Sequence, residues 1–162
     1  MTAEADYRLP RTVVPSRYML SLVPDLEAAS FTGTEVVDVE VVEPTSVVMV
    51  NAIDLEHSDV AMVDAANERH DAVAIGYDEA NQRAVLSFDR ELDPGLWQLH
   101  ADFQGTLNDD LHGFYRSTYH DEAGNEQVIA TTQFEATDAR RAFPCWDEPD
   151  LKATVVVSLE GA

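Results

Sequence analysis

The sequence predicts an all-β fold, an antiparallel β-sandwich or curled sheet that carries one short helical turn. Three observations support this prediction. Apolar and polar residues alternate with a period of two, strand-like runs recur at short and regular spacing, and turn residues separate these runs. Many short strands joined by turns are typical of antiparallel sheets.

Each expected strand is a short apolar or alternating run between turn residues. In the run 97–104, Trp97, Leu99, Ala101 and Phe103 share one face, so these side chains are expected in the core. The run 46–51 is almost wholly apolar and is expected to be a central strand. The expected strands, in chain order, cover residues 17–23, 32–42, 46–51, 59–65, 72–77, 83–88, 97–104, 114–119, 127–133 and 153–159.

The domain organisation follows from the turn residues. Residues 1–16 are expected to be a polar N-terminal arm, because Pro10 and Pro15 interrupt them. Residues 17–162 are expected to form one β-rich domain, which is long enough for a hydrophobic core. The chain stops just past its last strand, so we expect a domain that is truncated at its C-terminal end.

The composition excludes some classes of partner. The chain has 31 acidic and 10 basic residues, a net charge of −21, which repels nucleic acid phosphates and anionic membranes. The acidity has two interpretations: adaptation to high salt, or a field that draws cationic peptides to a site. No signal peptide or membrane-spanning run is visible, and the single cysteine excludes an internal disulfide, so a cytoplasmic protein is expected.

Histidine and cysteine patterns do not indicate a catalytic centre. No pair of histidines forms the H-E-x-x-H pattern, which places two imidazoles on one helical face. His112 and His120 could meet, but solvated loop histidines are the preferred interpretation, and we expect no metal site within this chain. Cys145 lies in an apolar loop, so a buried structural thiol is a better interpretation than a nucleophile.

Chemically distinct side chains are concentrated in residues 130–149. In an extended strand, Gln133 and Glu135 point to the same side, so an amide and a carboxylate are expected next to each other. Thr137 is expected to cap a short helical turn with Asp138 in its first turn, and Pro144 ends that turn early.

The rest of this stretch is expected to be structural. Arg140, Arg141, Asp147 and Glu148 are expected to form an ion-pair cluster that holds the loop. An alternative for Glu135 follows from this, because its carboxylate could pair with Arg140 or Arg141 and hold the loop as well. The side chains expected to pack beneath the loop are Phe143, Pro144 and Trp146.

A long run in this stretch resembles a known signature. TTQFEATDARRAFPCWDEP, residues 131–149, resembles the end of the N-terminal domain of M1-family zinc aminopeptidases, which include aminopeptidase N. The puromycin-sensitive and tricorn-interacting-factor types are the most similar. Two further runs agree: YRLPRTVVPSRYMLSLVPDLEAASFTG, residues 7–33, and LHGFYRSTY, residues 111–119.

The resemblance implies a fold and a role. The fold is the saddle-shaped N-terminal β-domain of the family. In similar aminopeptidases, the residue matching Glu135 helps to bind the free α-amine of the substrate peptide, and the one matching Gln133 lines the first subsite beside the metal. The zinc helix, the Gly-Ala-Met-Glu-Asn loop and the transition-state tyrosine of the family lie downstream of such a domain.

The resemblance thus implies a parent enzyme that removes N-terminal residues from peptides with Zn²⁺. This chain would wall its cleft, with peptide substrates and the absent catalytic domain as its partners, and would be inactive and bind no metal alone. Two alternatives remain open from the residues: a stand-alone β-sandwich binding module for carbohydrate or protein, and a free-standing regulatory homologue without peptidase activity.

Overall fold

The computed structural model describes residues 8–161 and confirms the predicted all-β fold. Helical structure in this range is limited to two 3₁₀ turns, η2 (Glu79–Asn81) and η3 (Ala139–Arg141). No helix in the described range is therefore long and apolar enough to cross a membrane. The strands are β1 (Val13–Asp25), β2 (Ser30–Val41), β3 (Thr45–Asn51), β4 (Leu55–Val63), β5 (Arg69–Asp71), β6 (Ala74–Asp78), β7 (Arg83–Leu92), β8 (Gly95–Thr106), β9 (Gly113–His120), β10 (Glu126–Gln133) and β11 (Thr154–Leu159).

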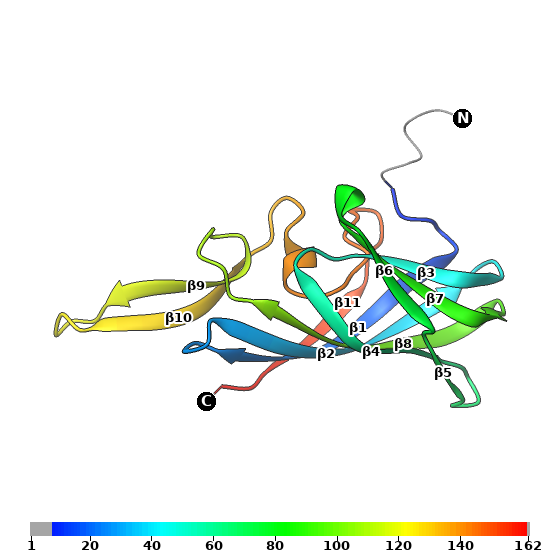
Figure 1. The fold of residues 1–162 in the computed structure, drawn as a ribbon, viewed down its shortest axis with the longest axis horizontal. Helices are drawn as coiled ribbons and strands as arrows, with labels where there is room; N and C mark the ends of the chain where they lie inside the picture. Colours follow the sequence, from blue (N-terminus) through cyan, green and yellow to red (C-terminus); the bar gives the residue numbers. More distant parts are fainter. Residues whose placement is uncertain (1–7, 162) are drawn as a thin grey trace.

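These strands form three sheets. The six-stranded sheet has the order β11-β1-β2-β8-β4-β5, and the three-stranded sheet has the order β3-β7-β6. Neighbouring strands are antiparallel except β1 and β11, which are parallel. The hairpin of β9 and β10 forms the third sheet and extends away from the other two (Figure 1).

One hydrophobic core joins the six-stranded and three-stranded sheets. Val37 of β2 lies opposite Leu99 of β8, and both are 0% exposed. Val50 and Leu86 from the three-stranded sheet belong to the same buried cluster. Each such side chain contributes about 1.5–3 kcal/mol to stability by burial. The period-two prediction for residues 97–104 is confirmed, because Trp97, Leu99, Ala101 and Phe103 are all buried.

The structure corrects the predicted place of the strand at 46–51. This strand is β3, and it lies at an edge of its sheet because β7 lies between β3 and β6. Its apolar character reflects burial of Val48 and Val50 against the core. The end of β3 also pairs with a loop, since Asn51 and Cys145 exchange two backbone hydrogen bonds at 2.7 and 3.0 Å.

The ends of several strands differ from the prediction. β5 occupies residues expected to form a turn and pairs with the last residues of β4. β1 begins at Val13, inside the expected arm, because Pro15 lies at a break in register where no ladder hydrogen bond is lost. Leu9 is also in the core. The rest of the expected arm, residues 1–7, lies outside the described residues.

Several ionisable side chains lie in the interior, among them Glu35 and Arg140. Glu35 of β2 is 2% exposed, and within residues 8–161 neither of its carboxylate oxygens has a hydrogen-bond partner. Burial raises the pKa of Glu35 well above its usual value. Arg140 of η3 is 8% exposed, and its hydrogen-bond partners are described with the candidate site.

Candidate functional site

The candidate site begins where β10 ends. β10 stops at Gln133, and the next residues turn back, because the Asp138 N–H donates to the Phe134 carbonyl at 3.0 Å. Glu135 therefore lies in a turn and not in the strand that the sequence predicted. The peptide bond from Glu135 to Ala136 is cis.

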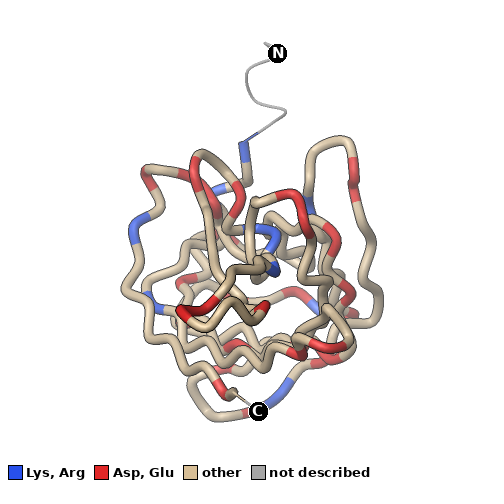
Figure 2. Tube along the Cα trace, turned by 90° about the vertical axis from the view of Figure 1, so that its left-hand side faces the viewer, with Lys and Arg blue, Asp and Glu red and all other residues tan. Residues whose placement is uncertain are grey.

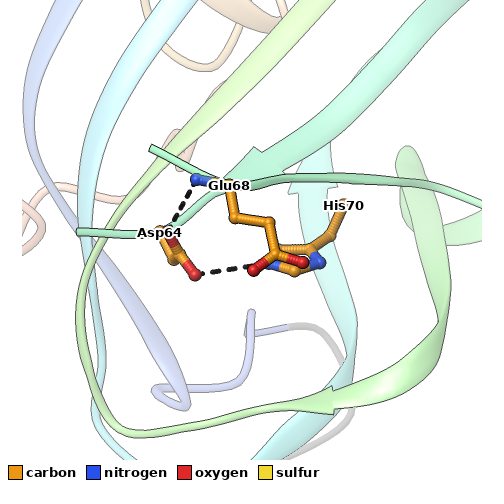
Figure 3. Close-up of side chains that lie close together, drawn as sticks. All are labelled: Asp64, Glu68 and His70. Atoms are coloured by element: carbon orange, nitrogen blue, oxygen red, sulfur yellow. Dashed lines mark hydrogen bonds and ion pairs between the residues drawn. The ribbon is translucent and has the colours of Figure 1, made fainter. Parts of the chain in front are cut away.

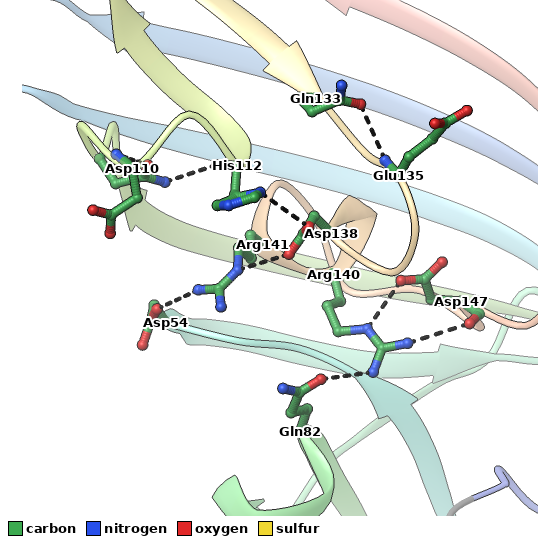
Figure 4. Close-up of polar contacts among 11 residues, drawn as sticks. Asp54, Gln82, Asp110, His112, Gln133, Glu135, Asp138, Arg140, Arg141 and Asp147 are labelled. Carbon is green, nitrogen blue, oxygen red and sulfur yellow. Dashed lines mark hydrogen bonds and ion pairs between the residues drawn. The ribbon is translucent and has the colours of Figure 1, made fainter.

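Gln133 and Glu135 are nevertheless neighbours. The Gln133 side-chain Oε1 accepts a hydrogen bond from the Glu135 backbone N–H at 3.2 Å. Both residues are exposed. Figure 4 shows the two side chains next to each other, away from the ion pairs of Arg140 and Arg141. Gln133 and Glu135 are thus adjacent as predicted, but the turn after β10 brings them together rather than a continuous strand.

The Glu135 carboxylate is available to a ligand. Within residues 8–161 it forms no hydrogen bond or ion pair, so the alternative of a bridge to Arg140 or Arg141 is wrong. An ionised carboxylate is an acceptor only, and its strongest neutral-pH partner is a cation such as an ammonium group. The Gln133 amide offers two donors beside it.

The short helical turn is present but is capped differently from the prediction. η3 covers Ala139–Arg141, and its N-cap is Asp138, not Thr137. The Asp138 side chain makes no cap hydrogen bond. It accepts instead from Arg141 Nε at 3.0 Å and lies 3.4 Å from His112 Nδ1.

The expected ion-pair cluster separates into three independent sets. Arg140 Nε donates to Asp147 at 2.9 Å, and its NH1 donates to Gln82 at 2.9 Å. Arg141 contacts Asp138 and Asp54, each at 3.0 Å. Glu148 accepts from the Arg11 side chain at 2.7 Å and from the Leu9 N–H. The loop is thus fixed to three different parts of the fold rather than to itself.

Aromatic and apolar side chains support this loop, as the sequence predicted. The Phe143 ring contacts the rings of Tyr18 and Phe134, with centroids 5.9 and 6.2 Å apart. Pro144 and Trp146 are buried, and the Trp146 N–H donates to the Tyr18 hydroxyl at 3.1 Å. The segment after Glu135 therefore packs on a well-anchored base.

Cys145 is part of that base. It is buried, as predicted, and burial raises the pKa of its thiol well above its usual value. A reactive cysteine needs the opposite shift, toward the thiolate. The environment of Cys145 thus suits a structural thiol.

One group of potential metal ligands occurs in the described part of the chain, and two of its side chains, Asp64 and His70, take part in hydrogen bonds. Asp64, Glu68 and His70 lie together in the β4–β5 turn (Figure 3). Arg90 can only donate, so His70 Nδ1 accepts from it at 3.3 Å, and the proton of neutral His70 lies on Nε2, toward Asp64. The Glu68 backbone N–H donates to Asp64 and lowers the pKa of that carboxyl, together with His70 and Ala66.

The surroundings of the site are polar and acidic. A pocket of about 520 Å³ beside the loop is lined by Thr137, Arg140 and Asp147, but not by Gln133 or Glu135. These two side chains therefore lie on an open surface. Figure 2 shows acidic positions spread throughout the loops and strands of the trace, with far fewer basic ones.

Sequence reasoning missed three residues that hold the site. Gln82 and Asp54 bind the two arginines from distant loops. Gly113 pairs with Gln133 and has a φ of +70°, a conformation that favours glycine. The glycine directly before the predicted strand at 114–119 was the one local signal of a close approach.

Comparisons with known proteins identify the family and confirm the resemblance. Residues 14–162 match the model of the Peptidase M1 N-terminal domain. Aminopeptidase M1 of Arabidopsis thaliana is 44% identical over 156 residues, which cover 94% of this chain and 18% of that protein. The puromycin-sensitive aminopeptidase of Caenorhabditis elegans is 39% identical over 153 residues, or 94% of this chain and 16% of that protein.

The alanine/arginine aminopeptidase of Saccharomyces cerevisiae is 38% identical over 156 residues, or 93% of this chain and 18% of that protein. The chain therefore spans less than a fifth of the length of these relatives. By this match and by its fold, the chain belongs to the family of Peptidase M1 N-terminal domains.

Proposed function

We propose that this chain is the N-terminal domain of a zinc aminopeptidase, and that it binds the free α-amine of peptide substrates through Glu135 and Gln133. The observation that supports this most is the exposed, unpaired Glu135 carboxylate beside the Gln133 amide. The names of the relatives, all aminopeptidases, support the same class of activity.

The proposed role is positioning rather than bond cleavage. A carboxylate and an ammonium form a charge-assisted hydrogen bond, which is stronger than a neutral one. Holding the N-terminus at a fixed point sets the register of the peptide, so that its first peptide bond reaches the catalytic group. Glu135 would bind the amine, and Gln133 would line the adjacent subsite.

Zinc chemistry belongs, in this proposal, to sequence outside this chain. Zinc would polarise the scissile carbonyl and activate water, and the H-E-x-x-H pattern that could hold it does not occur in this chain. The chain alone would form one wall of the cleft and would not hydrolyse peptides. We also propose that the parent enzyme works in the cytoplasm.

The test is the kinetics of the full-length protein encoded by the gene. Glu135→Gln should raise KM for a peptide substrate by about 10- to 100-fold, because a hydrogen bond to a charged group contributes about 1.5–3 kcal/mol. The matched control is Glu126→Gln, an exposed carboxylate at the start of β10, the strand that precedes Glu135, and this variant should behave as wild type.

A second arm of the test compares substrates. A peptide with an acetylated α-amine should be a poor substrate for both wild type and Glu135→Gln, so that the variant loses little with it. If Glu135→Gln keeps the wild-type KM for free peptides, the assignment of Glu135 is wrong. If the full-length protein removes no N-terminal residue from any peptide, the proposed activity is wrong.

A further inference from the structure

The turn that carries Glu135 is fixed at its last residue. Phe134 to Asp138 form a closed turn, through the hydrogen bond from the Asp138 N–H to the Phe134 carbonyl at 3.0 Å. The Glu135 carboxylate forms no hydrogen bond or ion pair with the described residues, and only the backbone N–H of Glu135 is bound, by Gln133. Its position therefore depends on the backbone of this turn, and that backbone depends on how Asp138 is anchored.

Two side chains from different elements hold the Asp138 carboxylate. Arg141 of η3 donates through Nε to Asp138 Oδ1 at 3.0 Å, and Nδ1 of His112, in the loop before β9, lies 3.4 Å from Oδ2 (Figure 4). The Asp138 side chain is only 19% exposed. A partly buried carboxylate with a guanidinium partner has a far better defined position than a solvated one.

Arg141 is itself fixed from two further directions. Its NH1 donates to Asp54 at 3.0 Å. Its Cβ lies against Gly113, where an added Cβ would come within 2.5 Å of Arg141 Cβ and 3.3 Å of the Asp138 carbonyl. Gly113 is the residue that pairs with Gln133 across the hairpin. Asp138 is therefore connected to Gln133 through Arg141 and Gly113.

From this arrangement we propose that Asp138 is a positioning residue, which fixes Glu135 relative to Gln133 through Arg141 and His112. The proposal rests on the proposed function, in which these two residues bind the substrate amine. Asp138 does not touch the peptide. Loss of its charge frees the turn, so the amine meets a misplaced carboxylate, while the chemistry of hydrolysis, located elsewhere, is unchanged. The effect should fall on KM and not on kcat.

The test uses Asp138→Asn in the full-length protein. We expect KM for free peptides to rise by up to about 10- to 100-fold, the size expected for loss of a hydrogen bond to a charged group, with kcat close to wild type. A competitive inhibitor that lacks an α-amine should keep its wild-type Ki. Arg141→Gln should show the same pattern, and the double variant should be little worse than either single one, because the two side chains act as one unit.

The matched control is Asp64→Asn. Asp64 also closes a turn and contacts a histidine, His70, but it lies between β4 and β5. Its variant should keep wild-type kinetics. If Asp138→Asn does not fold, Arg141→Gln carries the same test, since Arg141 is partly exposed.

The outcomes separate this inference from the function on which it rests. If Glu135→Gln raises KM but Asp138→Asn and Arg141→Gln do not, the positioning role is wrong and the proposed function stands. If the Ki of the amine-free inhibitor rises as much as KM, the variants disturb the whole cleft, and the positioning role is again wrong. If Glu135→Gln leaves KM unchanged, both proposals are overturned.

Discussion

Arg140 and Glu35 are both charged and both buried, yet their surroundings are opposite. The Arg140 guanidinium donates to the Asp147 carboxylate, the Asp147 carbonyl and the Gln82 side chain, at 2.9, 3.3 and 2.9 Å. The Glu35 carboxylate is buried on the core face of β2, and neither oxygen has a hydrogen-bond partner in the described part of the chain. One group is buried in a prepared polar site, and the other is buried in an apolar one.

The difference shows how position in the fold decides the state of a charge. Arg140 is surrounded by a loop whose residues supply acceptors, and its hydrogen bond to Gln82 connects that loop to the end of η2. Glu35 takes a position where β2 needs an apolar residue, and burial favours its neutral, protonated form. Tyr18 and Cys145 face the same region, and burial raises the pKa of each.

The largest expected effect is that of removing Arg140. Arg140→Met should lower the free energy of unfolding by about 3–5 kcal/mol, because it leaves the Asp147 carboxylate partly buried without its cation. Urea unfolding followed by tryptophan fluorescence measures this, since Trp97 and Trp146 are both buried. The double variant Arg140→Met/Asp147→Leu should recover part of the loss. A double variant less stable than the single one would contradict this account of the pair.

The second effect has the opposite sign. Glu35→Leu should raise the free energy of unfolding by about 1–3 kcal/mol at neutral pH, because it removes a buried polar group that has no partner. Glu35→Gln is the matched control, since it keeps an unpaired polar group but cannot ionise. It should gain less than Glu35→Leu.

The pH dependence separates these two variants from wild type. The folded-state pKa of Glu35 is raised above the unfolded value of about 4.5, so the unfolded chain releases a proton first as the pH rises. The contribution of protonated Glu35 to wild-type stability is therefore fully present below about pH 4.5, and it is lost as the pH rises through the folded-state pKa. The advantage of Glu35→Gln over wild type should be near zero at pH 4 and should grow with pH. A constant difference would show that Glu35 ionises normally in the fold.

The smallest effect is expected for an exposed pair. Arg69 contacts Asp59 and Asp71 on the surface, and all three side chains are largely exposed. Arg69→Gln should cost at most about 1 kcal/mol, and the cost should disappear at high salt, because exposed pairs are screened. The cost of Arg140→Met should persist at the same salt concentration. Equal salt sensitivity of the two variants would remove the distinction between buried and exposed cations.

Patterns of neighbouring residues, such as alternation and turn residues, correctly predicted several strands and one hairpin. β8 was predicted because successive side chains of a strand point to opposite faces, so a half-buried strand alternates between apolar and polar residues. The hairpin of β9 and β10 was predicted because turn residues lie between two alternating runs. Burial of Cys145 followed from its apolar neighbours in the same loop.

Contacts between distant segments could not be predicted in this way. β5 is three residues long and exists because β4 offers a free edge, which no local pattern records. Arg141 has Asp54 as a partner, and their spacing in the sequence carries no information about that contact. Glu135 was expected at the end of a strand, and the hydrogen bond that places it in a turn depends on where η3 packs.

The parallel pairing of β1 with β11 has a consequence for biosynthesis. β1 leaves the ribosome before the other described strands, and its register partners from Thr154 to Leu159 leave after all of them. Until they emerge, the outer edge of β1 presents unsatisfied amides to the crowded cell, where strands of other nascent polypeptides can attach. Slow translation through the middle of this chain would prolong that vulnerable interval, so molecular chaperones have most to protect here before β11 is made.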